Sequence, residues 1–120
     1  MILVDTSVWV DHLRLNLPLL ADLLDAGEVT THPFILGELA CGNLSNRKEI
    51  LALLVSLPPV TIATHAEALL LVEAHKLHGQ GIGWIDVHLL ASAMLTGIPL
   101  WTRDRKLHAA TKALGIAENS

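Results

Sequence analysis

The stretch Met1-Ile2-Leu3-Val4-Asp5-Thr6-Ser7-Val8-Trp9 opens the sequence and decides the fold. Its first four residues are all apolar and include β-branched side chains, which is typical of a buried strand. From Ser7 to Leu13 the apolar side chains return at helical spacing. The chain is therefore predicted to begin with a strand that runs directly into a helix.

The same alternation continues along the chain. Strands are predicted at 28–31, 60–62 and 99–102, with a short edge strand at 116–117. Helices are predicted at 18–27, 33–41, 47–57, 64–78, 86–95 and 105–114, and the glycine-rich segment 79–83 is predicted to be a loop. Strands that alternate with helices pair in parallel through crossover connections, so we expect an α/β fold with helices on both faces of the sheet.

Length and composition limit the classes of protein. With 120 residues, the chain is predicted to form one domain, 1–120. The hydrophobic fraction of 52% and mean hydropathy of +0.50 predict that some apolar surface meets another chain. Segment 84–101 has the length of a membrane span, but Asp86, His88, Gly97 and Pro99 interrupt it, so no membrane segment is expected. The net charge of −4 argues against a broad basic surface for nucleic acid.

The N-terminus has no basic segment before an apolar stretch and no cleavage site of small residues, so a cytoplasmic protein is expected. The lone Cys41 agrees with this expectation, because it cannot form an internal disulfide.

Four acidic residues stand where a charge is locally out of place, at the end of or within an apolar stretch: Asp5, Glu38, Asp86 and Asp104. A carboxylate buried without a partner is costly, so such acids are paired, hydrogen-bonded or bound to a cation. Asp5 and Asp104 both follow strands, and the carboxyl ends of parallel strands share one edge of the sheet. Asp86 lies at that edge too if its helix feeds the strand at 99–102, and Glu38 is the least firmly placed.

Each acid also has a simpler interpretation. Asp86 and Asp104 precede helical patterns and could cap them, Glu38 could pair with an arginine, and Asp5 could serve in a turn or cap the helix after it. Capping alone does not explain an acid inside an apolar helix together with acids at one sheet edge. An oxygen-only cluster suits Mg²⁺ or Mn²⁺, whereas the histidines lack the spacing of a zinc site.

These residues resemble those of a known family, the PIN-domain ribonucleases, and specifically the VapC-type toxins of prokaryotic toxin–antitoxin pairs. The resemblance spans nearly the whole chain. It rests on the segments 2–9 (ILVDTSVW), 37–39 (GEL), 86–93 (DVHLLASA) and 100–104 (LWTRD). The four acids fall in the family's order and at about its spacing.

The resemblance implies a three-layer α/β/α sandwich with a central parallel sheet, and hydrolysis of RNA phosphodiester bonds with Mg²⁺ or Mn²⁺. In that interpretation Asp5 and Asp86 are the firmest metal ligands, and Glu38 and Asp104 complete the set directly or through water. Thr6 and Thr102 match the family's supporting hydroxyl groups.

Three basic residues, Arg103, Arg105 and Lys106, flank Asp104 and are candidates for contacts with the RNA backbone, although a solvated basic turn explains them equally well. The resemblance also implies a homodimer and an antitoxin whose tail covers the active site. Segments 19–24 and 50–57 are candidate contact surfaces, with a plain core role for most of their leucines as the alternative.

Two rival functions can be compared. A strand-end aspartate is also the nucleophile of phosphatases that form an aspartyl-phosphate, but their pattern D-x-D-x-[TV] has an aspartate where this chain has Ser7. The other rival is a PIN-like scaffold that binds a partner without catalysis. Metal dependence that is lost when Asp5 or Asp86 becomes Asn would distinguish the nuclease from the scaffold.

Overall fold

A short parallel sheet forms the centre of the computed structural model, which describes residues 1–118. Strand β1 (Ile2–Val4) lies between β2 (Val29–Thr30) and β3 (Leu100–Trp101). Leu3 of β1 pairs with Thr30 on one side and with Leu100 on the other, in parallel in both cases. Asp5 therefore emerges from the middle strand, at the edge where all three strands end.

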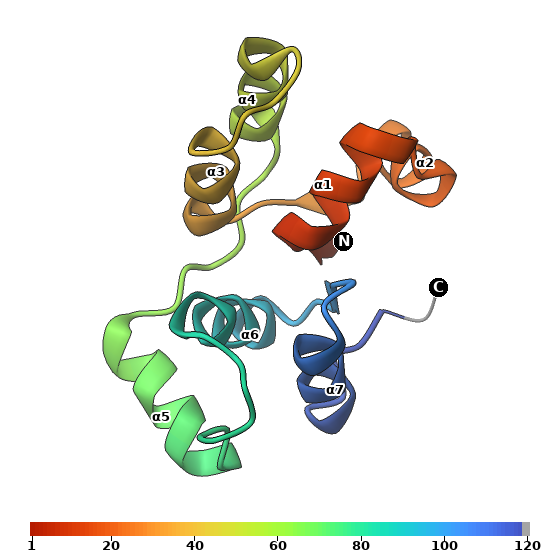
Figure 1. The fold of residues 1–120 in the computed structure, drawn as a ribbon. Helices are drawn as coiled ribbons and strands as arrows, with labels where there is room; N and C mark the ends of the chain where they lie inside the picture. Colours follow the sequence, from red (N-terminus) through yellow and green to blue (C-terminus); the bar gives the residue numbers. More distant parts are fainter. Residues whose placement is uncertain (119–120) are drawn as a thin grey trace.

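Seven helices surround the sheet within the described residues: α1 (Thr6–Leu15), α2 (Pro18–Asp25), α3 (Pro33–Ala40), α4 (Arg47–Ser56), α5 (His65–His75), α6 (Trp84–Thr96) and α7 (Arg105–Ala113). Figure 1 shows them as two groups on opposite sides of the molecule, with α1 to α4 on one side and α5 to α7 on the other. The predicted α/β fold with a parallel sheet is confirmed.

The ends of the helices follow local chemistry. Thr64 and Glu67 form a reciprocal capping box at the start of α5, which satisfies two free backbone N–H groups. Helix α6 ends at Gly97, whose backbone adopts a φ of 76°, a left-handed conformation that glycine tolerates at a helix C-terminus. A sharp stop here lets the chain turn back into β3.

The strand predicted at 60–62 is wrong. Only a single parallel bridge, between Thr31 and Pro59, forms in this region. Proline has no N–H group to donate to a ladder. The N–H of Val60 still donates to the carbonyl of Thr31, but the ladder goes no further, since the N–H of Thr61 donates to Oγ1 of Thr96 and that of Ala63 donates to Oγ of Ser92, both on α6.

Several other boundaries differ from the predicted ones, and two of the differences involve α6 and β3. Helix α6 begins at Trp84 and not at Asp86, so Asp86 lies in the first turn of the helix. The predicted edge strand at 116–117 is a single bridge between Leu100 and Ala117, supported by a hydrogen bond from the N–H of Leu100 to the carbonyl of Ile116.

Helix α6 is the most deeply buried helix, with every residue from Val87 to Ala93 buried. A helix that is apolar on all sides is packed on all sides, and α6 contacts both α5 and β3.

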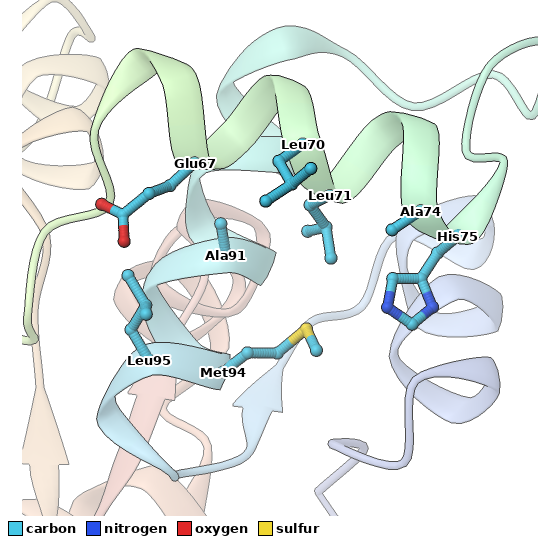
Figure 2. A pocket seen from close by; sticks show the side chains of 8 residues that line it. All are labelled: Glu67, Leu70, Leu71, Ala74, His75, Ala91, Met94 and Leu95. Carbon is cyan, nitrogen blue, oxygen red and sulfur yellow. The ribbon is translucent and has the colours of Figure 1, made fainter.

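A pocket of about 300 Å³ remains between α5 and the C-terminal half of α6, where Leu70 and Leu71 face Met94 (Figure 2). None of the four acids lines this pocket.

Among the described helices, none has the length and apolar character needed to cross a membrane.

Candidate active site

Asp5 is held in place from two sides. It is 6% exposed, and all of its side-chain hydrogen bonds within residues 1–118 fall on Oδ2. Ser7 donates through Oγ at 2.7 Å and, more weakly, through its N–H at 3.4 Å, and Thr102 donates through Oγ1 at 2.8 Å. Oδ1 is left without such a bond and is available to a ligand. Asp5 is also the N-cap of α1, as one of its simpler interpretations predicted.

The same two hydroxyl groups fasten the loop that follows β3. Oγ of Ser7 accepts from the N–H of Arg103 at 3.0 Å, and Oγ1 of Thr102 accepts from the N–H of Asp104 at 3.0 Å. The two hydroxyl oxygens lie 3.2 Å apart. Ser7 was missed as a site residue by the sequence analysis. Its position two residues after a strand-end aspartate that caps a helix was the available signal.

The other acids are each anchored by one donor. Oδ1 of Asp104 caps α7 by accepting from the N–H of Leu107 at 2.8 Å, and Oδ2 of Asp86 accepts from the N–H of Gly83 at 3.2 Å. The capping interpretation holds for Asp104, the N-cap of α7, whereas Asp86 lies in the first turn of α6 and reaches back to the N–H of the N-cap residue, Gly83. Oε1 of Glu38 accepts from Oγ1 of Thr6 at 2.7 Å, so its partner is a hydroxyl group and not the arginine considered from sequence.

The four acids also interact through their charges. Burial raises the pKa of Asp86 above its usual value, and the negative charges of Asp5, Asp104 and Glu38 raise it further, while the hydrogen bond from Gly83 lowers it. Like charges act in this way only over short distances. The structure thus brings the four predicted acids into one neighbourhood from β1, α3, α6 and the loop after β3.

Within residues 1–118, no cation forms an ion pair with an acid of this cluster. In residues 1–118 the ion pairs join the N-terminus to Glu28 and Arg103 to Asp11, the latter at 2.8 Å. Lys106 lies over the 79–83 loop, where a methyl group added at Gly81 would meet its Nζ at 2.8 Å. Of the three predicted RNA contacts, Arg105 and Lys106 lie on the first turn of α7, and neither forms an ion pair or side-chain hydrogen bond within residues 1–118.

The residues suit a hard divalent cation by their chemistry. All four side chains offer carboxylate oxygens, none is paired with a cation, and Asp5 has an oxygen without a hydrogen bond. No three His, Cys, Asp or Glu side chains in residues 1–118 are gathered closely enough to hold an ion between them directly. Mg²⁺ commonly uses one or two carboxylates and keeps several waters, so this spacing suits an ion held partly through water.

The chain matches the PIN domain family over residues 2–113. It belongs to the PIN-domain family. This membership agrees with the resemblance seen in the sequence, and it covers the elements from β1 through α7 that carry the four acids.

Curated relatives extend the likeness to the whole described chain. The chain is 45% identical over 118 residues to Ribonuclease VapC32 from two strains of Mycobacterium tuberculosis, CDC 1551 / Oshkosh and ATCC 25618 / H37Rv. The alignment covers 98% of this chain and 95% of each relative. The similarity thus extends over nearly the full length of proteins that are named as ribonucleases.

Solved structures share the fold at lower identity. PAE2754 from Pyrobaculum aerophilum superposes with a TM-score of 0.64 at 20% identity, covering 92% of this chain and 79% of that one. FitAcB from Neisseria gonorrhoeae gives a TM-score of 0.64 at 22% identity, covering 93% and 94%. At such identities the likeness concerns the fold alone.

Proposed function

We propose that this PIN-domain protein is a metal-dependent endoribonuclease that hydrolyses RNA phosphodiester bonds and acts as the toxin of a toxin–antitoxin pair. One observation carries the proposal: the charge of Asp86 is disfavoured by Asp5, Glu38 and Asp104 together, with no cation of the described chain to relieve it. Such a cluster is suited to a divalent ion. The relative named Ribonuclease VapC32 supports ribonuclease activity.

Asp5 and Asp86 would hold Mg²⁺ or Mn²⁺, with Glu38 and Asp104 completing the set directly or through water. When bound, such an ion polarises the phosphate and lowers the pKa of an attacking water. The chain's own residues prepare this arrangement. The hydrogen bonds from Ser7 and Thr102 fix Oδ2 of Asp5 and so set the direction of its other oxygen.

Thr6 performs the equivalent task for Glu38, because its hydroxyl group donates to Oε1 and turns the carboxylate toward the end of β1. Arg105 and Lys106 have no ion-pair partner in the described chain and are free to contact an RNA phosphate, whereas Arg103 would have to leave Asp11 first. RNA contact through these three residues belongs to the same proposal.

The family resemblance supports a cytoplasmic protein that binds an antitoxin and forms a homodimer. Large apolar side chains exposed on α2 and α4, among them Leu19, Leu53 and Val55, give such partners a surface in the two segments predicted for contact. The antitoxin's identity does not follow from these features.

Cleavage of a mixed pool of structured cellular RNAs by the purified, antitoxin-free protein tests the proposal. Mg²⁺, Mn²⁺ and EDTA would be compared, with Asp5→Asn as the control for the site and Asp25→Asn, an exposed acid of α2, as the matched control. Discrete cuts that need the metal and vanish only in Asp5→Asn are expected. Intact RNA throughout, with no change in melting on adding metal, would favour the binding scaffold.

A further inference from the structure

We propose that Phe34 and Trp84 form a stacking site for an unpaired nucleobase of the RNA substrate, beside the acidic cluster. The inference rests on the proposed ribonuclease function and names a part of the substrate that this site would grip. It starts from the unusual placement of these two rings.

Aromatic side chains are scarce in this chain, which has three tryptophans, one phenylalanine and no tyrosine. Trp9 is completely buried and Trp101 is partly buried. In contrast, Phe34 is 38% exposed and Trp84 is 39% exposed. Large rings contribute most to stability when they are buried. The partial exposure of two of the four large aromatic rings therefore calls for another explanation.

Both rings lie on the helices that carry acids of the site. Phe34 precedes Glu38 by four residues on α3, which places the two side chains on the same side of the helix, one turn apart. Trp84 precedes Asp86 by two residues in the first turn of α6. The ring and the acid therefore share one side of α3, whereas on α6 Trp84 faces His88, four residues further on, because residues two apart on a helix do not face each other.

His88 joins the rings from the protein side. Its imidazole lies 5.1 Å from the Phe34 ring and 4.6 Å from the Trp84 ring between centroids, with interplanar angles of 73° and 90°. Further imidazoles support each ring, His32 against Phe34 at 5.0 Å and His65 against Trp84 at 5.1 Å. Edge-to-face contacts of this kind hold the rings in fixed orientations.

The space next to Phe34 favours a nucleotide as the occupant, and Trp84 lies outside its lining, joined to Phe34 through His88. An open hollow of about 540 Å³ is lined by Phe34, Glu38 and Ile85, among other residues. A ligand there touches an aromatic ring and a carboxylate of the cluster at once. A nucleotide has a flat base to stack on the ring and a phosphate that a divalent ion can join to the carboxylates. Stacking on a fixed ring accepts any base, because every base has a π-face.

A purely apolar protein partner fits this hollow less well, because it would bury the rings against unneutralised carboxylates and gain nothing from them. RNA can stack a base on the ring and bind the carboxylates through the ion, so both groups favour its binding when the ion is present. The stacking site therefore predicts that single-stranded RNA binds more tightly with Mg²⁺ than with EDTA.

The test measures binding in the unmodified protein with all four acids in place, using Ca²⁺, a hard cation that takes the same oxygen ligands, instead of Mg²⁺ so that the probe stays intact. The probes are 5′-fluorescein-labelled single-stranded nonamers of adenylate, cytidylate and uridylate, followed by fluorescence anisotropy. Trp84→Leu and Phe34→Leu should each raise Kd about 5- to 150-fold, which corresponds to the loss of one stacked base. Trp84→Phe keeps an aromatic ring and should remain within about threefold of the parent.

Leu70→Ala is the matched control, since Leu70 is 68% exposed on α5 and lines the separate pocket of Figure 2. Its Kd should stay within about twofold of the parent. Tryptophan fluorescence gives a second readout. RNA should quench the parent's emission, and Trp84→Phe should lose that quenching although it still binds. Melting curves of each variant establish that it is folded.

Unchanged Kd values in both leucine variants would overturn the stacking site. The same result with a loss of dimer in sedimentation would assign the rings to a contact between protein chains. If no nonamer binds but the unmodified protein cuts cellular RNA with Mg²⁺, the proposed stacking site is wrong and the proposed ribonuclease function is supported. If it neither binds nor cuts, both proposals fail.

Discussion

Oγ1 of Thr102 donates a hydrogen bond of 2.8 Å to Oδ2 of Asp5, across 97 positions of the sequence. The bond joins the end of β1 to the end of β3 at the edge of the sheet. Both groups are buried, so the loss of the donor would leave a carboxylate oxygen short of a partner.

Replacing Thr102 by valine, which has nearly the same shape, should lower the free energy of unfolding by about 1–3 kcal/mol. It should also raise the Mg²⁺ concentration needed for half-maximal cleavage, because Asp5 is no longer oriented. Thr102→Ser keeps the hydroxyl group and should recover most of both losses. Urea unfolding and a Mg²⁺ titration measure the two effects. A valine variant equal to the parent in both would remove Thr102 from the site.

Ser7→Ala should free the loop after β3, because Oγ of Ser7 is the acceptor for the N–H of Arg103. The backbone amide of Arg103 should then exchange with solvent faster in hydrogen-exchange NMR. The amide of Leu107, which Asp104 caps independently, serves as the internal reference. Equal acceleration at both amides would point to general destabilisation and not to the loss of this contact.

Asp86→Asn should raise the stability, and with it the melting temperature, of the metal-free protein at pH 7. The folded state raises the pKa of Asp86, through burial first and through its acidic neighbours second. A carboxyl group with a raised folded pKa disfavours folding at every pH above that pKa, so the penalty is present at neutral pH and asparagine removes it.

The same variant should lose stabilisation by Mg²⁺. An ion that binds only the folded state contributes about 2.7 kcal/mol at a hundred times its Kd. Thermal melting in EDTA and in Mg²⁺ compares the unmodified protein, Asp86→Asn and the surface control Asp25→Asn. If Asp86→Asn melts lower in EDTA and still responds to Mg²⁺, Asp86 has a structural role and not the role proposed.

His32 should make the protein acid-sensitive. Burial, together with the nearby His88, lowers its pKa from 6.5 to about 4. Its Nδ1 accepts from the N–H of Phe34 and its Nε2 is buried without a partner in the described chain, so the neutral ring is favoured. Since the unfolded chain takes up the proton first, stability should be full above pH 6.5 and fall by as much as about 3 kcal/mol as the pH drops to 4.

Urea unfolding at pH 7.5 and pH 5 measures this loss. His32→Asn offers an amide oxygen in place of Nδ1, so it can still cap α3 and should show a much smaller difference between the two pH values. His88, whose pKa is also lowered by burial and by His65, acts in the same direction, and Asp86 acts in the opposite one. An undiminished pH dependence in His32→Asn would assign the effect to another group.

Much of this organisation could be predicted from local sequence patterns. The apolar run before Asp5 predicted β1, and the position of the four acids at the end of or within apolar stretches identified them before the family motifs did. The strand at 60–62 was wrong because the amide of Thr61, and that of Ala63 after it, bond to Thr96 and Ser92 of α6, a long-range contact that a β-branched pattern does not reveal.

The hydroxyl group of Ser7 and the exposed rings escaped prediction for a similar reason. Ser7 gains its importance from contacts with Thr102 and Arg103, nearly a hundred positions away. Phe34 and Trp84 are neighbours only through His88, once α3 and α6 have packed. Contacts of this kind depend on the assembled fold and have no local signature.

The bond between Asp5 and Thr102 also bears on how this chain is made. Asp5 leaves the ribosome early, but its partner and the loop that carries Asp104 are synthesised about a hundred residues later. A chain released before residue 100 lacks β3, the hydroxyl group that orients Asp5 and the fourth acid. A round of translation interrupted before this point would therefore release a fragment without the full set of four acids.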